Sequence, residues 1–530
     1  MDVKELKAAL ERARGVLSAE DYALLTGAVD TFTALTRELQ LKGATLERLR
    51  RLFLGGSSEK TKKVLRKEEE GEESQGESSA SSTGASEEKP KAKGHGRNGA
   101  AAYSGATRKT VAHESLHAGD SCPGCKAGKV YPMKEPALLV RVRGVAPLEA
   151  TVWECERLRC NACGEVHTAP TPEGVGTEKY DESADAMVGM MRYGAGVPFN
   201  RVERLQKGMG IPLPASTQWD LVERRVDALI PVHDALVRHA AQGEVLHNDD
   251  TSMTVLELGE RTREEALAAG ESEKMADRTG VRTTGIVSVV GQHKVALFFT
   301  GRQIAGESLE EVLQERLARL PPAIHMADAL SHNLPELPDG LETIVANCLA
   351  HGRRHFVDIV NSFPTECRKV LETLTDVYKH DALARAQGLS PQQRLQLHQQ
   401  RSGPLMKALQ KWMQAELDEH RVEPNSPLGE AMRYMLKHWP ALTLFLREPG
   451  APLDNNICER ALKKAILHRK NSLFYRTVHG AFVGDLYMSL IHTAELNGVE
   501  PFPYLVALMR HPKEVAEAPE TWLPWNYPTG

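Results

Sequence analysis

The sequence contains no long hydrophobic run. None of its 530 residues belongs to an uninterrupted apolar stretch of about 18 residues, which is the length that crosses a bilayer. The first residues, MDVKELKAALERARG, are charged and helix-forming, and they do not show the basic segment followed by an apolar one that marks a secretory signal. The sequence therefore predicts a cytoplasmic protein that does not interact with membranes.

The chain also has few cysteines and no excess of basic residues. Five of its eight cysteines lie between residues 122 and 163, and this clustering indicates a metal site in a reducing compartment rather than a set of disulfides. The formal net charge of −5 argues weakly against a nucleic-acid partner. Much of the acidic charge lies in one low-complexity stretch, however, so the local charge is more informative than the sum.

The N-terminal part is predicted to contain a helical segment, residues 1–54, and a disordered linker, residues 55–114. Leu39, Leu46 and Phe53 repeat every seven residues, which fits either an amphipathic helix packed on its own domain or a short coiled coil that pairs protomers. The linker consists mainly of charged residues, serine and glycine, so it has almost nothing to bury.

Residues 115–175 are predicted to form a zinc-binding domain because they contain the two motifs CPGC and CNAC. A CxxC loop places two thiolates on one side of a tetrahedron, and four thiolates complete the coordination of a structural Zn²⁺ ion. Cys155 has no cysteine two or three residues away and is expected to be a strand residue. The predicted ligands are Cys122, Cys125, Cys160 and Cys163.

Residues 176–240 are predicted to be helical and to bind DNA. The break GMGIPLPAS between two helical runs is similar to the turn of a helix-turn-helix, with Ser216 or Thr217 as the N-cap of the second helix. Basic side chains here either contact phosphates or are ordinary surface charge. They are Arg201, Arg204, Lys207, Arg224 and Arg225.

Residues 241–500 are predicted to form an α/β domain. Three strand-like runs with short links suggest antiparallel neighbours. A helical run, a fourth strand, a further helix and a fifth strand are expected to follow, and this order predicts an RNase H-like fold whose first strand is central and adjacent to the fourth. The expected strands are residues 244–258, 283–292, 294–301, 323–329 and 343–351.

Two aspartates stand out in this arrangement. Asp249 lies on the first strand and Asp328 at the end of the fourth, so the fold is expected to bring them together although they lie far apart in the sequence. Neighbouring carboxylates repel each other unless cations neutralise them, and two Mg²⁺ ions about 3.5–4 Å apart do this in phosphoryl-transfer enzymes. Alternatively, both are common turn residues, and Asp250 on the opposite face competes with Asp249.

A third acid, Glu459, lies in the segment DNNICERALKKAILHRKNSLFYR. Its position three residues after Asn456 fits a capping box, in which its carboxylate only accepts from the backbone at the helix start. The basic residues that follow fit a metal ligand beside a DNA backbone instead, and the residues alone leave both interpretations open.

With these motifs the chain resembles the transposases of the insertion-sequence 66 group over most of its length. The most specific segments are CLAHGRRHF and DNNICERALKKAILHRKNSLF. The resemblance implies that Asp249, Asp328 and Glu459 form the catalytic Asp-Asp-Glu set and bind two Mg²⁺ or Mn²⁺ ions. The chain departs from the family pattern at Asp250, which replaces a glutamate, and at Ala329–Leu330, which replace Gly-Tyr.

The long stretch of chain between Asp328 and Glu459 exceeds what one connection requires, and it predicts a helical insertion at residues 361–450. Residues 501–530 are expected to be a C-terminal tail. The expected fold class is therefore multidomain α/β, with an RNase H-like core that carries the insertion and follows the N-terminal helical, zinc-binding and helix-turn-helix-like segments.

The resemblance implies a transposase that binds the ends of a mobile element as a homo-oligomer, with or without accessory proteins, and is associated with the nucleoid. It would free the 3′-hydroxyls at these ends and join them to target DNA. The alternatives are a catalytically silent DNA-binding descendant and a simple RNase H-like nuclease. The candidate DNA contacts are Arg201, Arg204, Lys207, Arg353, Arg354, Arg460, Lys463, Arg469 and Lys470.

Overall fold

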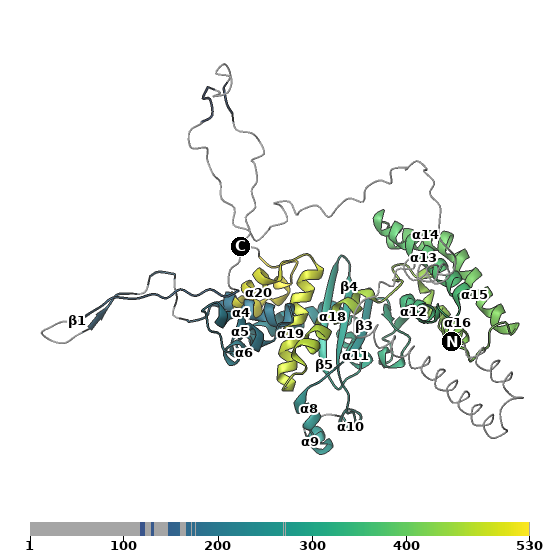
Figure 1. The fold of residues 1–530 in the computed structure, drawn as a ribbon, viewed down its shortest axis with the longest axis horizontal. Coiled ribbons are helices and arrows are strands. Elements are labelled where there is room, and N and C mark those ends of the chain that lie inside the picture. Colours follow the sequence, from purple (N-terminus) through teal and green to yellow (C-terminus); the bar gives the residue numbers. More distant parts are fainter. Residues whose placement is uncertain are drawn as a thin grey trace, which may run out of the picture. The chain divides into compact units, whose positions relative to one another are not determined.

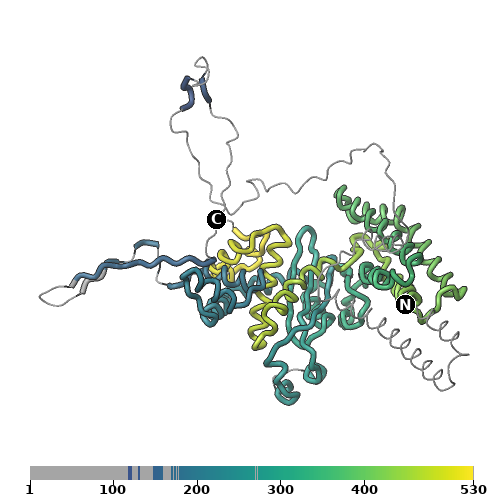
Figure 2. The backbone as a smooth tube through the Cα atoms, viewed as in Figure 1, coloured from purple at the N-terminus to yellow at the C-terminus, as the bar shows by residue number. Residues whose placement is uncertain are grey.

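The computed structural model describes residues 117–528, except 122–128, 132–146, 160–165, 171, 175, 177, 269 and 271. The predicted segments 1–54 and 55–114 and the four cysteines of the CxxC motifs lie outside these residues. The chain divides into two compact units. In the described part, the first contains Leu236–Met253 and Leu258–Ala465, and the second contains residues up to Ala235, Thr254–Glu257 and the chain from Ile466 onward. Figures 1 and 2 show their elements.

The first unit is built on a mixed five-stranded sheet. Its strand order is β5-β4-β3-β6-β7, with antiparallel pairs β3–β4 and β4–β5 and parallel pairs β3–β6 and β6–β7. The first strand is therefore central and adjacent to the fourth, as predicted. The strands are β3 Val245–Met253, β4 Val281–Val290, β5 His293–Gly301, β6 Ala323–Ala327 and β7 Thr343–Asn347.

Two connections differ from the prediction. A short link was expected after the first strand, but β3 and β4 are joined through α8 Leu256–Glu260, α9 Arg263–Ala268 and α10 Glu273–Ala276, whose Ala, Leu, Glu and Lys residues are good helix formers. A helix was expected between the fourth and fifth strands, but only the 3₁₀ turn η3 Ser331–Asn333 is present. Two prolines in the following NLPELPDG segment prevent a longer helix.

Helices cover both faces of the sheet near its centre. On one face, α11 Ala305–Gln314 contacts β3 and β4, and the Asn248 amide donates to Ala305 O at 3.1 Å. On the other face, α18 Asn456–Ser472 reaches β4, where the Cys458 thiol donates to Gly285 O at 3.1 Å. Successive residues of β3 therefore face different helices.

The expected helical runs between the second and third acids are helices in the structure and share one apolar core with the sheet. Val245 and Met326 of the strands are buried together with side chains of this helical group, which is drawn in green in Figure 1. The helices are α12 Leu349–Ile359, α13 Pro364–Ala386, α14 Pro391–Leu397, α15 Gly403–Asp418, α16 Pro427–Lys437 and α17 Trp439–Leu442.

The second unit is mostly helical. Residues 501–528 belong to its packed part, since the fully buried Tyr504 donates to Trp522 O at 2.9 Å. The N-cap of α6 is Pro214, without a side-chain cap, so the prediction of Ser216 or Thr217 was wrong. The main helices are α4 Glu182–Gly189, α5 Phe199–Gly208, α6 Ala215–Glu223, the first part of α7 Val226–Ala241, α19 Val478–Leu496, α20 Pro501–Arg510 and α21 Pro512–Glu517.

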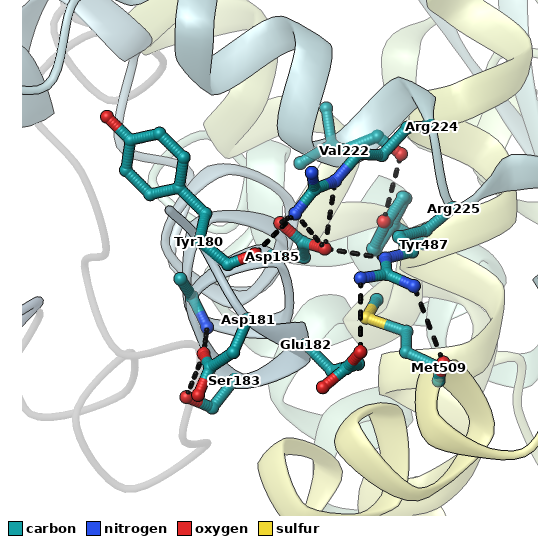
Figure 3. Close-up of polar contacts among 11 residues, drawn as sticks. Tyr180, Asp181, Glu182, Ser183, Asp185, Val222, Arg224, Arg225, Tyr487 and Met509 are labelled. Atoms are coloured by element: carbon teal, nitrogen blue, oxygen red, sulfur yellow. Dashed lines mark hydrogen bonds and ion pairs between the residues drawn. The ribbon is translucent and has the colours of Figure 1, made fainter. Parts of the chain in front are cut away.

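A buried carboxylate holds several of these helices together. Asp185 of α4 is fully buried and accepts from Arg224 at 2.7 Å and from Arg225 at 2.5 Å, as Figure 3 shows. Removing one partner of such a network leaves an uncompensated buried charge. Arg224 and Arg225 therefore bind a carboxylate of their own unit.

The described helices include none that is long and apolar enough to cross a membrane.

Candidate active site

The first unit brings the three predicted acids into one neighbourhood. Asp249 lies on β3, Asp328 directly follows β6, and Glu459 lies in the first turn of α18. The parallel register pairs Val245 with Ile324 and His247 with Met326. If this register is continued by two residues along both strands, Asp249 pairs with Asp328. Their side chains then lie on the face that α18 covers.

Electrostatics within the first unit supports this grouping. The pKa of Asp249 is raised from 3.8 to about 7, first by burial and then by the nearby carboxylates of Asp328, Asp250 and Glu459, against the lowering effect of the hydrogen bond from the Asp250 backbone N–H. Like charges raise each other's pKa only at short range. The carboxylates of Asp328 and Glu459 therefore lie close enough to Asp249 to affect its charge.

Asp250 has a different environment from its neighbour. Its side chain is 6% exposed and forms an ion pair with Arg282 at 2.8 Å, and His332 lies 3.7 Å from its second oxygen. Strand alternation places Asp250 on the same face as Asn248, which contacts α11. The structure thus distinguishes two aspartates that the sequence left as rivals.

Asp328 is held by the turn that follows β6. Its Oδ1 accepts from the backbone N–H of Leu330 at 3.1 Å and from the side-chain amide of Asn333. The amide of Asn347 on β7 donates to Asp328 O at 3.3 Å. These bonds fix the backbone and one carboxylate oxygen at the edge where β3 and β6 end.

Glu459 does not make the capping-box contact. The Asn456 N–H donates to Asp454 Oδ1 at 3.2 Å. Glu459 Oε1 is buried and has no hydrogen-bond partner among the described residues. The structure therefore gives no support to the interpretation of Glu459 as a helix cap.

Sequence reasoning missed a buried pair of side chains that fixes α18 to β3. Asn455 directly precedes α18 and is fully buried. Its amide nitrogen donates to Asn248 O at 2.9 Å, so its oxygen is available to accept from His247 Nδ1 at 3.0 Å. Burial lowers the pKa of His247 to about 4, which keeps its ring neutral. The asparagine pair that precedes Glu459 in the sequence was the available signal.

Close packing of α18 on β4 depends on a residue without a side chain. Gly285 pairs with Asp249 across the strands, and a Cβ at this position would lie 3.0 Å from Leu462 of α18. Glycine thus allows α18 to approach the sheet beside Asp249.

The helical group also reaches the acids. Tyr434 of α16 lies near Asp328, since that carboxylate contributes, after burial, to raising the pKa of Tyr434 to about 12. A Cβ at Gly352 of α12 would lie 2.5 Å from Met435. The segment between the second and third acids therefore forms part of the wall of the site.

The basic residues predicted to contact DNA have different environments. Those of α5 and most of those of α18 are exposed, whereas Arg353 is 9% exposed. An arginine buried to this degree is poorly placed for a phosphate. The exposed ones are Arg201, Arg204, Lys207, Arg354, Arg460, Lys463 and Lys470, and Arg469 is half-buried.

The second unit contains a cavity of about 1150 Å³ lined by Phe199, Trp219, Phe474 and Arg192, among other residues. The Arg192 guanidinium lies 4.8 Å from the centre of the Phe199 ring. Aromatic faces beside a cation can accept a flat ligand such as an unpaired base.

Two sets of side chains in the first unit are candidates for cation binding. The oxygens of Asp249, Asp328 and Glu459 suit a hard cation such as Mg²⁺. Glu459 also belongs to a second set with Cys348 and His351, whose ligand atoms all lie within 4.8 Å of one another.

Comparisons with known proteins place this geometry in context. The family described as “Transposase IS66 family” matches residues 179–482. The uncharacterized protein y4hP of Sinorhizobium fredii is 26% identical over 399 residues, which cover 70% of this chain and 67% of that protein. The uncharacterized proteins y4jD and y4qI of the same organism are 35% identical over 188 residues and 30% identical over 190 residues. These matches cover 34% and 35% of this chain and only about a third of each relative, 36% and 34%.

Proposed function

Because the chain belongs to the IS66 family of transposases, we propose that it cleaves the ends of an insertion sequence and joins the freed 3′-hydroxyls to target DNA. The observation that carries this proposal is the cluster formed by Asp249, Asp328 and Glu459. The strand order β5-β4-β3-β6-β7, with helices on both faces, supports an RNase H-like core.

The three acids fit two Mg²⁺ ions, or Mn²⁺ in their place. All three offer carboxylate oxygens, Asp328 and Glu459 contribute to the raised pKa of Asp249, and Glu459 Oε1 lacks a hydrogen-bond partner in the described part of the chain. When bound, such cations activate the attacking hydroxyl and stabilise the leaving oxygen in phosphoryl transfer.

The chain's own residues position the reaction. Asp249 would hold a cation through its deprotonated carboxylate, and the raised pKa of about 7 means that this form is available at and above neutral pH. Asn455 and His247 hold the first turn of α18 against β3, which keeps Glu459 beside the aspartates. Correct alignment of the reacting groups lowers the barrier because their orientation is fixed in advance.

DNA binding is assigned to the exposed basic residues. Arg460 and Lys463 are exposed on the helix that carries Glu459, so a phosphate bound there would be close to the acids. Arg201, Arg204 and Lys207 are exposed on α5, in the segment proposed as helix-turn-helix-like. Lysine and arginine contacts of this kind supply salt-dependent affinity for the DNA backbone.

We further propose that the four cysteines of the CxxC motifs hold a structural Zn²⁺. The described residues that flank them pair in antiparallel fashion, Ser121 with Lys129 and β1 Arg157–Arg159 with β2 Val166–Thr168. This antiparallel pairing of the flanking residues supports the proposal. The same proposal includes the domain limits predicted from the sequence. It also includes assembly as a homo-oligomer on element ends, accessory proteins and a nucleoid-associated cytoplasmic location.

The test is an incubation of the purified full chain with Mg²⁺ and labelled element ends. Joined products support a transposase, nicks without joining support a simple nuclease, and a gel shift without cleavage supports a silent DNA-binding protein. Alanine substitution of Asp249, Asp328 or Glu459 is expected to abolish joining while the gel shift remains. Full strand transfer by any one of these variants would remove that acid from the proposed site.

A further inference from the structure

A thiol, an imidazole and a carboxylate meet at the start of two helices in the first unit. Cys348 is the N-cap of α12, His351 lies in its first turn, and Glu459 lies in the first turn of α18. His351 Nδ1 is 3.7 Å from Glu459 Oε1, and the ligand atoms of all three residues lie within 4.8 Å of one another.

Two of these atoms are buried and have no hydrogen-bond partner among the described residues. His351 Nδ1 and Glu459 Oε1 both belong to this group, and their separation of 3.7 Å is too long for a hydrogen bond. A buried polar atom without a partner costs about 1–3 kcal/mol. A cation between the two atoms would satisfy both.

The thiol is placed to act as the third ligand. Cys348 is fully buried, and its Sγ accepts from the Asn455 backbone N–H at 3.2 Å. An N–H directed at sulfur stabilises a metal-bound thiolate, as hydrogen bonds to the ligands of other metal sites do. The spacing Cys-x-x-His at a helix start places sulfur and imidazole on the same side.

We propose that Cys348, His351 and Glu459 bind a thiophilic divalent cation of the Zn²⁺ class, at a site that shares Glu459 with the three-acid cluster but does not use Asp249 or Asp328. Sulfur and nitrogen ligands favour Zn²⁺, whereas Mg²⁺ prefers oxygen alone. Zn²⁺ binds such ligands at about 2.0–2.3 Å, so the three ligand atoms must close in by about 1 Å. Cys348 releases its thiol proton to solvent as the metal–sulfur bond forms, and a water fills the fourth position.

The site would position the third acid. His351 and Glu459 lie far apart in the sequence, with most of the helical group between them, and the cation would join their helices directly. The inference rests on the proposed function only because Glu459 would be shared between the two sites. Cation binding itself is measured without DNA.

The test is loading of the full chain with Co²⁺, which reports sulfur ligation through near-ultraviolet charge-transfer absorption. The wild type is expected to bind one equivalent of Co²⁺ more than Cys348→Ser does and to show stronger sulfur-to-cobalt charge-transfer absorption. The matched control is Cys367→Ser, which alters another fully buried cysteine, on α13, and should bind as the wild type does. Equal cobalt content and equal spectra for the wild type and Cys348→Ser would overturn the proposal.

Two further variants keep the test decisive. His351→Gln alters a side chain that is 24% exposed, so it should fold even where the cysteine variant does not, and it should also lose one equivalent. Asp249→Asn disrupts the three-acid cluster and should leave the cobalt spectrum unchanged, also in excess Mg²⁺. Retention of the full equivalent of cobalt by His351→Gln refutes the site, and loss of the signal in Asp249→Asn refutes its independence from Asp249.

Discussion

The two faces of the five-stranded sheet give the adjacent residues Asp249 and Asp250 opposite electrostatic environments. On the face that carries α11, Asp250 is 6% exposed and forms an ion pair with Arg282. On the face that carries α18, Asp249 meets two further carboxylates. A cationic partner offsets part of the cost of burying an acid, whereas an acid beside other acids is costly unless a ligand compensates it. The α18 face therefore has the charge pattern expected of the proposed site, and on the α11 face the acid has a partner within the protein.

The sharpest test of this contrast exchanges one oxygen for nitrogen on each face. Asp249→Asn is expected to lower strand transfer about 1000-fold or more, because it removes a proposed cation ligand and an electrostatic contribution to the transition state. Asp250→Asn should change activity by less than about 10-fold, since it only weakens an ion pair. The measurement is the rate of joining at saturating DNA. Similar losses for both variants would show that the two faces do not differ in function.

A second prediction concerns the link between α18 and β3. Asn455→Ala removes the bonds to His247 and Asn248, so we expect a loss of about 2–3 kcal/mol in stability. Activity should fall about 10–100-fold, as for other residues that orient ligands. Chemical denaturation and strand-transfer rates measure the two effects. Asn456→Ala is the control, because the bond to Asp454 uses its backbone N–H; an equal effect of both substitutions would contradict a specific role for Asn455.

The third prediction tests how closely α18 must approach the sheet. Gly285→Ala places a Cβ 3.0 Å from Leu462, and overpacking of this kind costs about 1–3 kcal/mol. The displacement should also lower activity, because α18 carries Glu459. The double variant Gly285→Ala, Leu462→Ala restores the space, so it should recover part of the activity. If the double variant is less active than Gly285→Ala alone, steric displacement is not the cause.

The order of strands was predictable because each strand of the sheet corresponds to an apolar run in the sequence that is bounded by turn residues. The positions of Asp249, Asp328 and Glu459 on its elements followed from that order and from the family resemblance. The strand pattern left the choice between Asp249 and Asp250 open, since apolar residues occur at both parities along β3, and the family resemblance assigned the role to Asp249. The physical difference between the two aspartates depends on Arg282, which lies on β4 and forms an ion pair with Asp250 in the folded chain.

The connections were harder to predict for a physical reason. The short helices α8, α9 and α10 directly follow the strand β3. Each has too few residues for the hydrophobic period of a helix to be distinguished from that of a strand. The roles of His247 and Asn455 depend on two hydrogen bonds between segments that lie far apart in the sequence. The asparagine pair before Glu459 marks this position in the sequence, but a single sequence does not identify the side chains that it contacts.

The smallest expected effect is on the stability of the metal-free protein. The pKa of Asp249 is about 7 in the folded chain instead of 3.8, so the folded state holds a proton that the unfolded state has lost between these pH values. Stability should therefore fall as pH rises from about 4 to about 7, and the melting temperature should drop by a few degrees. Added Mg²⁺ should reverse the drop. Asp249→Asn should flatten this dependence and melt higher than the wild type at pH 8, whereas Asp250→Asn should keep the wild-type slope. A wild-type slope in Asp249→Asn would mean that the repulsion on the α18 face resides in other groups.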